Sequence, residues 1–169
     1  LSLSSLDEAG LAYELATDWL FEQKYNENNY KAYRSELTTF LHWCFDVIKL
    51  NVSAIGRKEI GLYVDYCKHP PLALIGYFNV AQFKQDNTSD IRTPNPSWLP
   101  FRGCKVDGQI KPYVLSDSAL KTKIAILSSF YSYLMGEDYC ERNPAQMWLN
   151  KSRFSSSRKY RLNTDDDNQ

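Results

Sequence analysis

The spacing of apolar residues is the feature that most constrains the fold of this chain of 169 residues. In several separate segments they recur every three or four positions, and such residues share one face of an α-helix. The clearest segment follows Ser116 and ends at Gly136, which predicts a helix capped by the serine and ended by the glycine. Its predicted core face consists of Leu120, the stem of Lys123, Ile124, Leu127, Phe130, Tyr131 and Leu134.

The same periodicity predicts three earlier helices, over residues 6–23, 29–48 and 57–68. Ser5 followed by Glu8 has the spacing of a capping box at the start of the first helix. Two prolines, Pro70 and Pro71, follow the third helix and are expected to stop it. Pro144 suits the first position of a short turn or helix over residues 143–149.

Residues 70–115 lack this periodicity and hold six of the seven prolines. They are long for a connection between helices, so we expect partial order within them. A first part, residues 71–83, is compatible with either a short helix or an extended segment. Residues 84–98 are expected to form a loop, and Trp98 and Phe101 are expected to pack on the core.

These patterns predict an all-α fold, a small bundle of four to five helices with a long Pro-rich insertion between the third and fourth main helices. A hydrophobic content of 43% is enough for such a core. We expect one domain over residues 1–150. Residues 151–169 lose the periodicity and mix basic residues with serines, which is typical of a linker or tail.

Several function classes lack support in the sequence. No apolar run reaches the ~20 residues that a membrane span requires, and residues 1–6 lack the features of a signal peptide. The four cysteines form no CxxC pair, and two histidines cannot build a histidine metal triad. No phosphate-binding glycine loop, GxSxG or HExxH motif occurs. We therefore expect no catalysis by this chain, no cofactor, no metal, no small-molecule substrate and no membrane, but free cysteines and a cytoplasmic location.

The formal net charge of zero hides an uneven distribution of charge. Acidic residues concentrate at the two ends of the chain. Residues 28–164 carry 19 basic and 11 acidic side chains, a net charge of +8. Such a balance suits a polyanionic partner.

Two of the predicted helices carry polar residues along one side of their apolar face. In the helix over 29–48 these are Lys31, Arg34, Ser35, Thr38 and His42, and in the helix that follows Ser116 they are Lys121, Ala125, Ser128 and Ser132. Hydroxyls and cations at such positions can contact phosphate oxygens. The alternatives are a solvated surface for the cations, helix capping for Asn28 and Asn29, and close helix packing for Ala125 and Ser128.

The order of these segments resembles the N-terminal core-binding domain of the phage integrases, the tyrosine site-specific recombinases. The segments that carry the resemblance are AYELATDWL (12–20), NENNYKAYRSELTTFLHWC (26–44), VSAIGRKEIGLYVDYC (52–67) and LSDSALKTKIAILSSFYSYLMGEDYCERNPA (115–145). Together they contain 75 of the 169 residues, a little under half of the chain. The resemblance lies in their order and spacing, since no single motif is specific.

The resemblance implies a helical domain that clamps one face of duplex DNA at a recombination site, in a bacterial protein that self-associates on DNA. A separate catalytic domain performs cleavage in this family, and we expect this chain to lack it. DNA contacts from the second and fourth helices then map onto Asn29, Lys31, Arg34 and Thr38, and onto Lys121, Lys123 and Ser128. Ser35, which belongs to the same polar stripe as Lys31, is a further candidate DNA contact. If residues 151–169 form a basic connector, the candidates also include Lys151, Arg153, Arg158 and Lys159.

Two other readings stay open from the residues alone. One is a helical protein–protein interaction domain whose basic patch is incidental, and the other is a self-contained enzyme. Binding through phosphate contacts weakens steeply with salt, which separates DNA binding from the first alternative.

Overall fold

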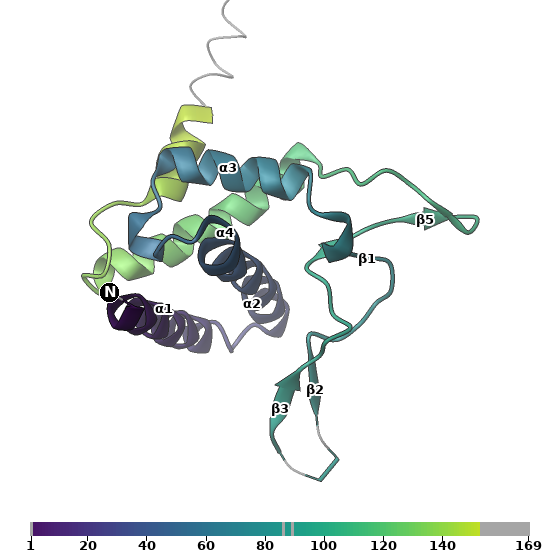
Figure 1. Cartoon of the computed structure of the whole chain (residues 1–169), viewed down its shortest axis with the longest axis horizontal. Helices are drawn as coiled ribbons and strands as arrows, with labels where there is room; N and C mark the ends of the chain where they lie inside the picture. The colour runs from purple at the N-terminus through teal and green to yellow at the C-terminus, as the bar shows by residue number, and fades with distance from the viewer. Residues whose placement is uncertain (1, 86, 89, 153–169) are drawn as a thin grey trace, which may run out of the picture.

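The computed structural model describes residues 2–85, 87–88 and 90–152, and side chains from residue 8 onward. The chain is mostly helical, and a few short strands lie between its third and fourth helices (Figure 1). The helical elements are α1 (Ser2–Glu22), α2 (Glu27–His42), η1 (Trp43–Ile48), η2 (Val52–Ala54), α3 (Arg57–Lys68), η3 (Leu72–Leu74), α4 (Asp117–Gly136) and a further helix over residues 144–152. The strands are β1 (Ile75–Gly76), β2 (Phe83–Gln85), β3 (Arg92–Pro94), β4 (Phe101–Arg102), β5 (Lys105–Val106) and β6 (Gln109–Ile110).

The predicted bounds of α3 and α4 are confirmed. The Ser116 hydroxyl caps α4 by accepting a hydrogen bond from the backbone N–H of Ala119 at 3.1 Å. The start of α2 was predicted wrongly, because its cap is Asn26, whose side-chain oxygen accepts from the N–H of Asn29 at 3.2 Å. The cap of α1 was also wrong, since the helix begins at Ser2, ahead of Ser5.

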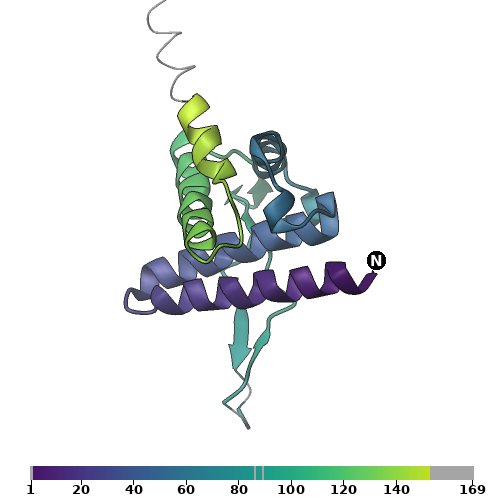
Figure 2. The same cartoon turned by 90° about the vertical axis from the view of Figure 1, so that its left-hand side faces the viewer.

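One aromatic residue of α1 joins three helices. The helices α1 and α2 lie side by side and run in opposite directions, and α4 crosses them steeply (Figure 2). Trp19, which is 2% exposed, stacks on Tyr33 of α2 with ring centroids 5.3 Å apart. Its indole also lies 5.3 Å from the ring of Phe130 on α4. The apolar faces predicted for α2 and α4 therefore meet in one core.

A second aromatic cluster attaches α3 to this core. The ring of Tyr63 lies 5.1 Å from Phe40 and 5.2 Å from Trp43, and all three side chains are buried. Behind them the hydroxyl of Tyr131 on α4 donates to the carbonyl of Val52 at 2.8 Å. This bond fixes the turn that leads into α3, because a buried hydroxyl without a partner would be costly.

The segment between α3 and α4 contains strands that an all-α prediction excludes. The parallel pair β1–β4 brings Ile75 opposite Phe101, and β2–β3 and β5–β6 are antiparallel hairpins. Phe101 is 1% exposed, so its predicted packing on the core is confirmed. Strands of two or three residues leave no period-2 pattern in the sequence, which is why they were missed.

Glycines are required at two places in this segment. A Cβ atom at Gly103 would lie 2.3 Å from the ring of Tyr77, so no larger residue fits beside that ring. Asp107 and Gly108 join β5 to β6 with φ angles of 52° and 76°. Two consecutive positive φ angles are typical of the Asp-Gly turn of a tight hairpin.

The last described helix, over residues 144–152, packs beside α4 (Figures 1 and 2). Asn143 caps it through its side-chain oxygen, which accepts from the N–H of Gln146 at 3.0 Å, and Pro144 occupies the first position as predicted. The helix buries Ala145 and Leu149. It continues through Lys151 and Ser152, so the secondary structure has no break at residue 150.

The cysteines are all free thiols, as expected, and two of them lie in the core. Cys44 and Cys67 are both 0% exposed. Burial raises the pKa of the Cys67 thiol to about 11, and it raises the pKa of Cys44 further. In the part of the chain that the structure describes, no helix has the length and apolar character needed to cross a membrane.

We predict that Leu127→Ala destabilises the protein by about 2–5 kcal/mol, because it opens a cavity at a completely buried position of α4. Chemical denaturation followed by circular dichroism measures the change in the free energy of unfolding. Met135→Ala, on the same helix but 39% exposed, is the control and should cost less than about 1 kcal/mol. A cost below half a kcal/mol for Leu127→Ala would show that α4 packs by another face.

We also predict that one thiol per chain reacts quickly with a disulfide reagent at pH 8. Only the thiolate reacts, and Cys104 is the exposed cysteine. Partial burial raises the pKa of Cys140 to about 11, so it should react slowly, while Cys44 and Cys67 should react only after unfolding. Cys104→Ser should abolish the fast phase, and a second fast thiol in that variant would contradict the described packing.

Candidate functional site

The polar stripe of α2 lies against the segment that connects α3 to α4. Arg34, in the middle of the stripe, is half-buried, and its Nε donates to the side-chain oxygen of Gln82 at 3.0 Å. Its guanidinium carbon lies 4.7 Å from the ring centre of Phe83 and 5.5 Å from that of Tyr30. Both rings therefore lie within cation–π distance of the guanidinium, an interaction that stabilises it by about 0.5–2 kcal/mol.

Gln82 continues this network to the next turn of α2. The side chain of Gln82 is 9% exposed, and its Nε2 donates to the hydroxyl of Thr38 at 2.9 Å. That hydroxyl in turn donates to the carbonyl of Arg34 at 2.7 Å. Arg34, Thr38 and Gln82 therefore form a closed set of hydrogen bonds that anchors the connection on α2.

A groove runs between α1 and α2 beside this anchor. Its cavity has a volume of about 590 Å³. Its apolar walls include Leu20, Leu41 and Phe83, and the cations Lys24 and Arg34 also line it. Within the described part of the chain, neither cation has a carboxylate partner. The groove therefore combines apolar walls with unneutralised positive charge.

The remaining candidates on α2 differ in their surroundings. Asn29 and Lys31 are exposed, and Lys31 pairs with Glu27 one turn earlier at 3.2 Å. Such an exposed pair is weak and can exchange for another anion. Ser35 is half-buried and lines a separate cavity of about 420 Å³ between α2 and the connection. A phosphate can therefore reach Asn29 and Lys31 more easily than Ser35.

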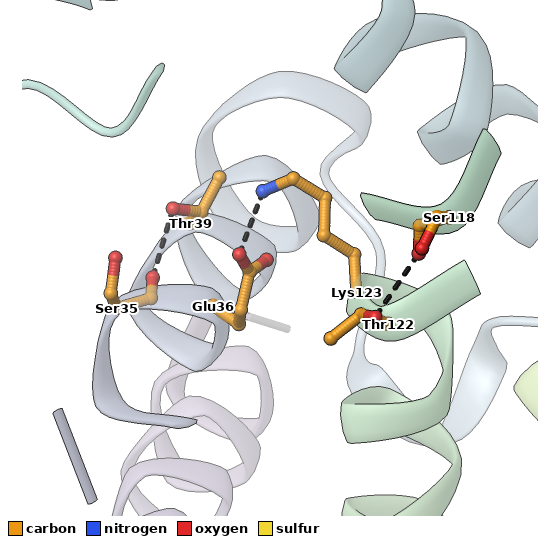
Figure 3. Close-up of polar contacts among 6 residues, drawn as sticks. All are labelled: Ser35, Glu36, Thr39, Ser118, Thr122 and Lys123. Carbon is orange, nitrogen blue, oxygen red and sulfur yellow. Dashed lines mark hydrogen bonds and ion pairs between the residues drawn. The ribbon is translucent and has the colours of Figure 1, made fainter. Parts of the chain in front are cut away.

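Lys123 forms a largely buried ion pair inside the fold. Its ammonium lies 2.7 Å from a carboxylate oxygen of Glu36, and the two side chains are 14% and 18% exposed (Figure 3). The same ammonium lies 5.7 Å from the ring centre of Phe101. This pair joins α2 to α4 beneath the connection, so Lys123 serves packing in this structure rather than offering a free cation.

Ser128 is also buried, and it is hydrogen-bonded within the fold. It is 7% exposed, and its hydroxyl donates to the side-chain oxygen of Gln146 at 3.0 Å. The side-chain amide of Asn143 donates to the carbonyl of Ser128 at 2.8 Å. The small side chain at position 128 therefore lets the helix over 144–152 approach α4, which is the packing alternative raised by the sequence. In this fold Ser128 is buried beneath the helix over 144–152, and its hydroxyl already has a partner.

The other predicted cations are either exposed or outside the described residues. Lys121 and Lys151 are exposed. Arg153, Arg158 and Lys159 lie outside the described residues.

Helix geometry argues against one surface shared by the α2 and α4 stripes. Glu36 faces α4 and stands roughly 140° around α2 from Lys31, given 3.6 residues per turn. Lys121 stands roughly 160° around α4 from Lys123, which faces α2. Lys31 and Lys121 therefore point away from the contact between the two helices, in different directions.

No local sequence signal indicates the roles of Gln82, Glu36 and Gln146, the side chains that bond the polar stripes of α2 and α4. Each is a polar residue whose partner is distant in the sequence; Glu36 and Lys123, for example, are 87 positions apart. For Asn143 a local signal existed but was not used, because an Asn-Pro step before a helix indicates a cap. Among the described residues, no three His, Cys, Asp or Glu side chains converge on a possible metal position.

Comparison with known proteins assigns no family to the chain. No protein-family model matches the chain, and neither a curated protein sequence nor a solved structure gives a significant match.

We predict that Lys123→Met destabilises the protein by about 2–4 kcal/mol, since it leaves the Glu36 carboxylate largely buried without its partner. Adding Glu36→Leu should restore stability to within about 1 kcal/mol of the natural protein, because well-packed apolar residues can replace a buried pair. The free energy of unfolding is measured for the single and double variants.

The exposed pair Lys31–Glu27 provides the matched control. Lys31→Met should change stability by less than about 0.5 kcal/mol, as expected for a solvated pair. Equal effects of Lys31→Met and Lys123→Met would contradict the distinction between the two pairs.

Proposed function

We propose that this chain is a DNA-binding module, the core-binding domain of a tyrosine site-specific recombinase of the phage-integrase type. The observation that carries this proposal is the polar surface of α2. Asn29, Lys31, Arg34 and Thr38 lie outside the apolar core, and Arg34 and Thr38 line the groove that α2 forms with α1. The order of the four segments that resemble this family adds support.

The proposed mechanism is electrostatic clamping of the DNA backbone. Cations supply attraction to phosphates, and hydroxyls and amides fix the position of the protein without reading the sequence. Arg34 suits this role because its aromatic neighbours and its bond to Gln82 restrict its side chain before binding. A restricted side chain loses less conformational entropy when it contacts a ligand.

The proposal assigns no catalytic residue to the chain. Cleavage and rejoining of DNA would belong to a catalytic domain elsewhere in the parent protein, which would self-associate on DNA in the cytoplasm. The segment between α3 and α4 would be an insertion in the helical bundle, and the residues from Lys151 onward would lead toward that domain.

A helical protein-interaction domain is the second candidate. One observation favours it: α1 exposes large apolar side chains, with Tyr13 50% and Phe21 63% exposed. Groups of exposed apolar residues mark interaction sites in many proteins. Binding there would depend on apolar burial and would respond little to salt.

We predict that the chain binds duplex DNA with an apparent Kd of roughly 10⁻⁴–10⁻⁶ M at physiological salt and with little sequence preference, as in non-specific binding. Fluorescence anisotropy at several salt concentrations measures the affinity and its salt slope. Lys31→Glu should weaken binding and reduce the slope by about one unit.

Lys58→Glu, an exposed charge reversal on α3, is the control and should have a smaller effect. Absence of DNA binding, or binding that salt leaves unchanged, would favour the protein-interaction reading.

A further inference from the structure

The connection between α3 and α4 carries an antiparallel ribbon, formed by β2 and β3, that extends away from the helices (Figures 1 and 2). An isolated two-stranded ribbon is marginally stable in water, so its base must be held by other contacts. Gln82, directly before β2, is nearly buried and bonded to α2. Asn95, directly after β3, is 8% exposed, and its amide donates to the carbonyl of Ala81 at 2.8 Å.

The register of the ribbon decides which residues share a face. Phe83 pairs with Pro94, Lys84 with Thr93, and Gln85 with Arg92. Directly paired residues lie on the same side, and neighbours along a strand alternate. One face therefore carries Phe83, Gln85 and Arg92, while Lys84 and Thr93 lie on the opposite face.

The face with Arg92 continues the polar surface of α2. Phe83 contacts the guanidinium of Arg34, so this face of the ribbon is turned toward α2 at its base. Gln85 and Arg92 follow on the same face, roughly 7 Å farther out at about 3.4 Å per residue. The ribbon and the groove between α1 and α2 thus form a corner, with Lys24 and Arg34 on one side and Arg92 on the other.

We infer that the ribbon is a second DNA-contacting element, whose Gln85 and Arg92 face binds the phosphate backbone of the duplex held by α2. The inference rests on the proposed function. A two-stranded ribbon has the size to enter a DNA groove. Arg92 is exposed and has no carboxylate partner among the described residues, and the neighbouring Gln85 adds two amide donors.

The chemistry of this face favours DNA over a protein partner. Protein interfaces depend on buried aromatic or apolar anchors. The aromatic residue of this face, Phe83, is half-buried and already packed on Arg34, and the positions beyond it are polar and exposed. Charged and amide donors without an apolar anchor suit phosphate oxygens.

The two basic residues of the ribbon provide a matched test. Arg92→Ala removes a cation from the face turned toward α2, and Lys84→Ala removes one from the opposite face of the same ribbon. Both residues are exposed, so both variants should fold, which circular dichroism and thermal unfolding verify. Affinity for a duplex of about 30 base pairs is measured by anisotropy across a salt series, with the complete chain.

Arg92→Ala should weaken binding about tenfold and reduce the salt slope by about one unit, as expected for the loss of one charge-assisted phosphate contact. Lys84→Ala should weaken it less than about twofold. Equal effects of the two variants would overturn the inference, since they would report only the net charge of the ribbon.

The failures of the two proposals are distinguishable. If the natural chain does not bind DNA in a salt-dependent way, the proposed function is wrong and the inference fails with it. If the natural chain binds and Lys31→Glu weakens binding while Arg92→Ala does not, the DNA-binding function stands. In that case the ribbon does not contact the DNA and would serve a different partner, such as a protein, so the inference is overturned.

Discussion

The rest of the fold depends on the contact of Trp19 with two other helices. The indole stacks on Tyr33 and also packs against Phe130, so one side chain fixes α1 relative to both α2 and α4. Its position leaves the outer sides of α1 and α2 free to form the groove beside Arg34. The surface proposed for DNA thus exists because the aromatic core holds α1 and α2 side by side.

On both α2 and α4, a small hydroxyl residue beside the apolar face attaches a later segment of the chain to the helix. On α2 the hydroxyl of Thr38 accepts a hydrogen bond from Gln82, and on α4 the hydroxyl of Ser128 donates to Gln146. In each case a glutamine from a later segment forms a hydrogen bond with the hydroxyl and thereby attaches that segment to the helix. Polar residues beside an apolar face can therefore be attachment points for the chain itself, as well as contacts for a ligand.

This dual use explains what the sequence could predict. Local signals sufficed for the bounds of α3, for the Ser116 cap of α4 and for the buried face around Leu127, since each depends on residues a few positions apart. They failed at Lys123, where the stem was correctly placed in the core but the partner of the charge, Glu36, was not foreseen. A helical pattern shows that a side chain lies at the edge of a core, but not which distant segment covers it.

The short strands illustrate the same limit. Ile75 and Phe101 pair although 25 residues separate them, and neither lies in a run with alternating apolar residues. Long-range pairing of this kind depends on the closed connection as a whole, including the close approach of Gly103 to Tyr77. The positions of Arg34 and Thr38 on α2 depend on the same connection, because both are hydrogen-bonded to its Gln82.

A single amide links the two proposed DNA-contacting elements. Gln82 bonds Arg34 and Thr38 on α2 and precedes the first residue of the ribbon. Movement of the ribbon relative to α2 would have to break these hydrogen bonds, and each of those polar groups would then need water or another partner. The geometry of the corner between groove and ribbon is therefore set by the fold before any ligand arrives. A preformed corner loses less entropy on binding than two independent elements would, which favours simultaneous contact of both with one rigid partner such as duplex DNA.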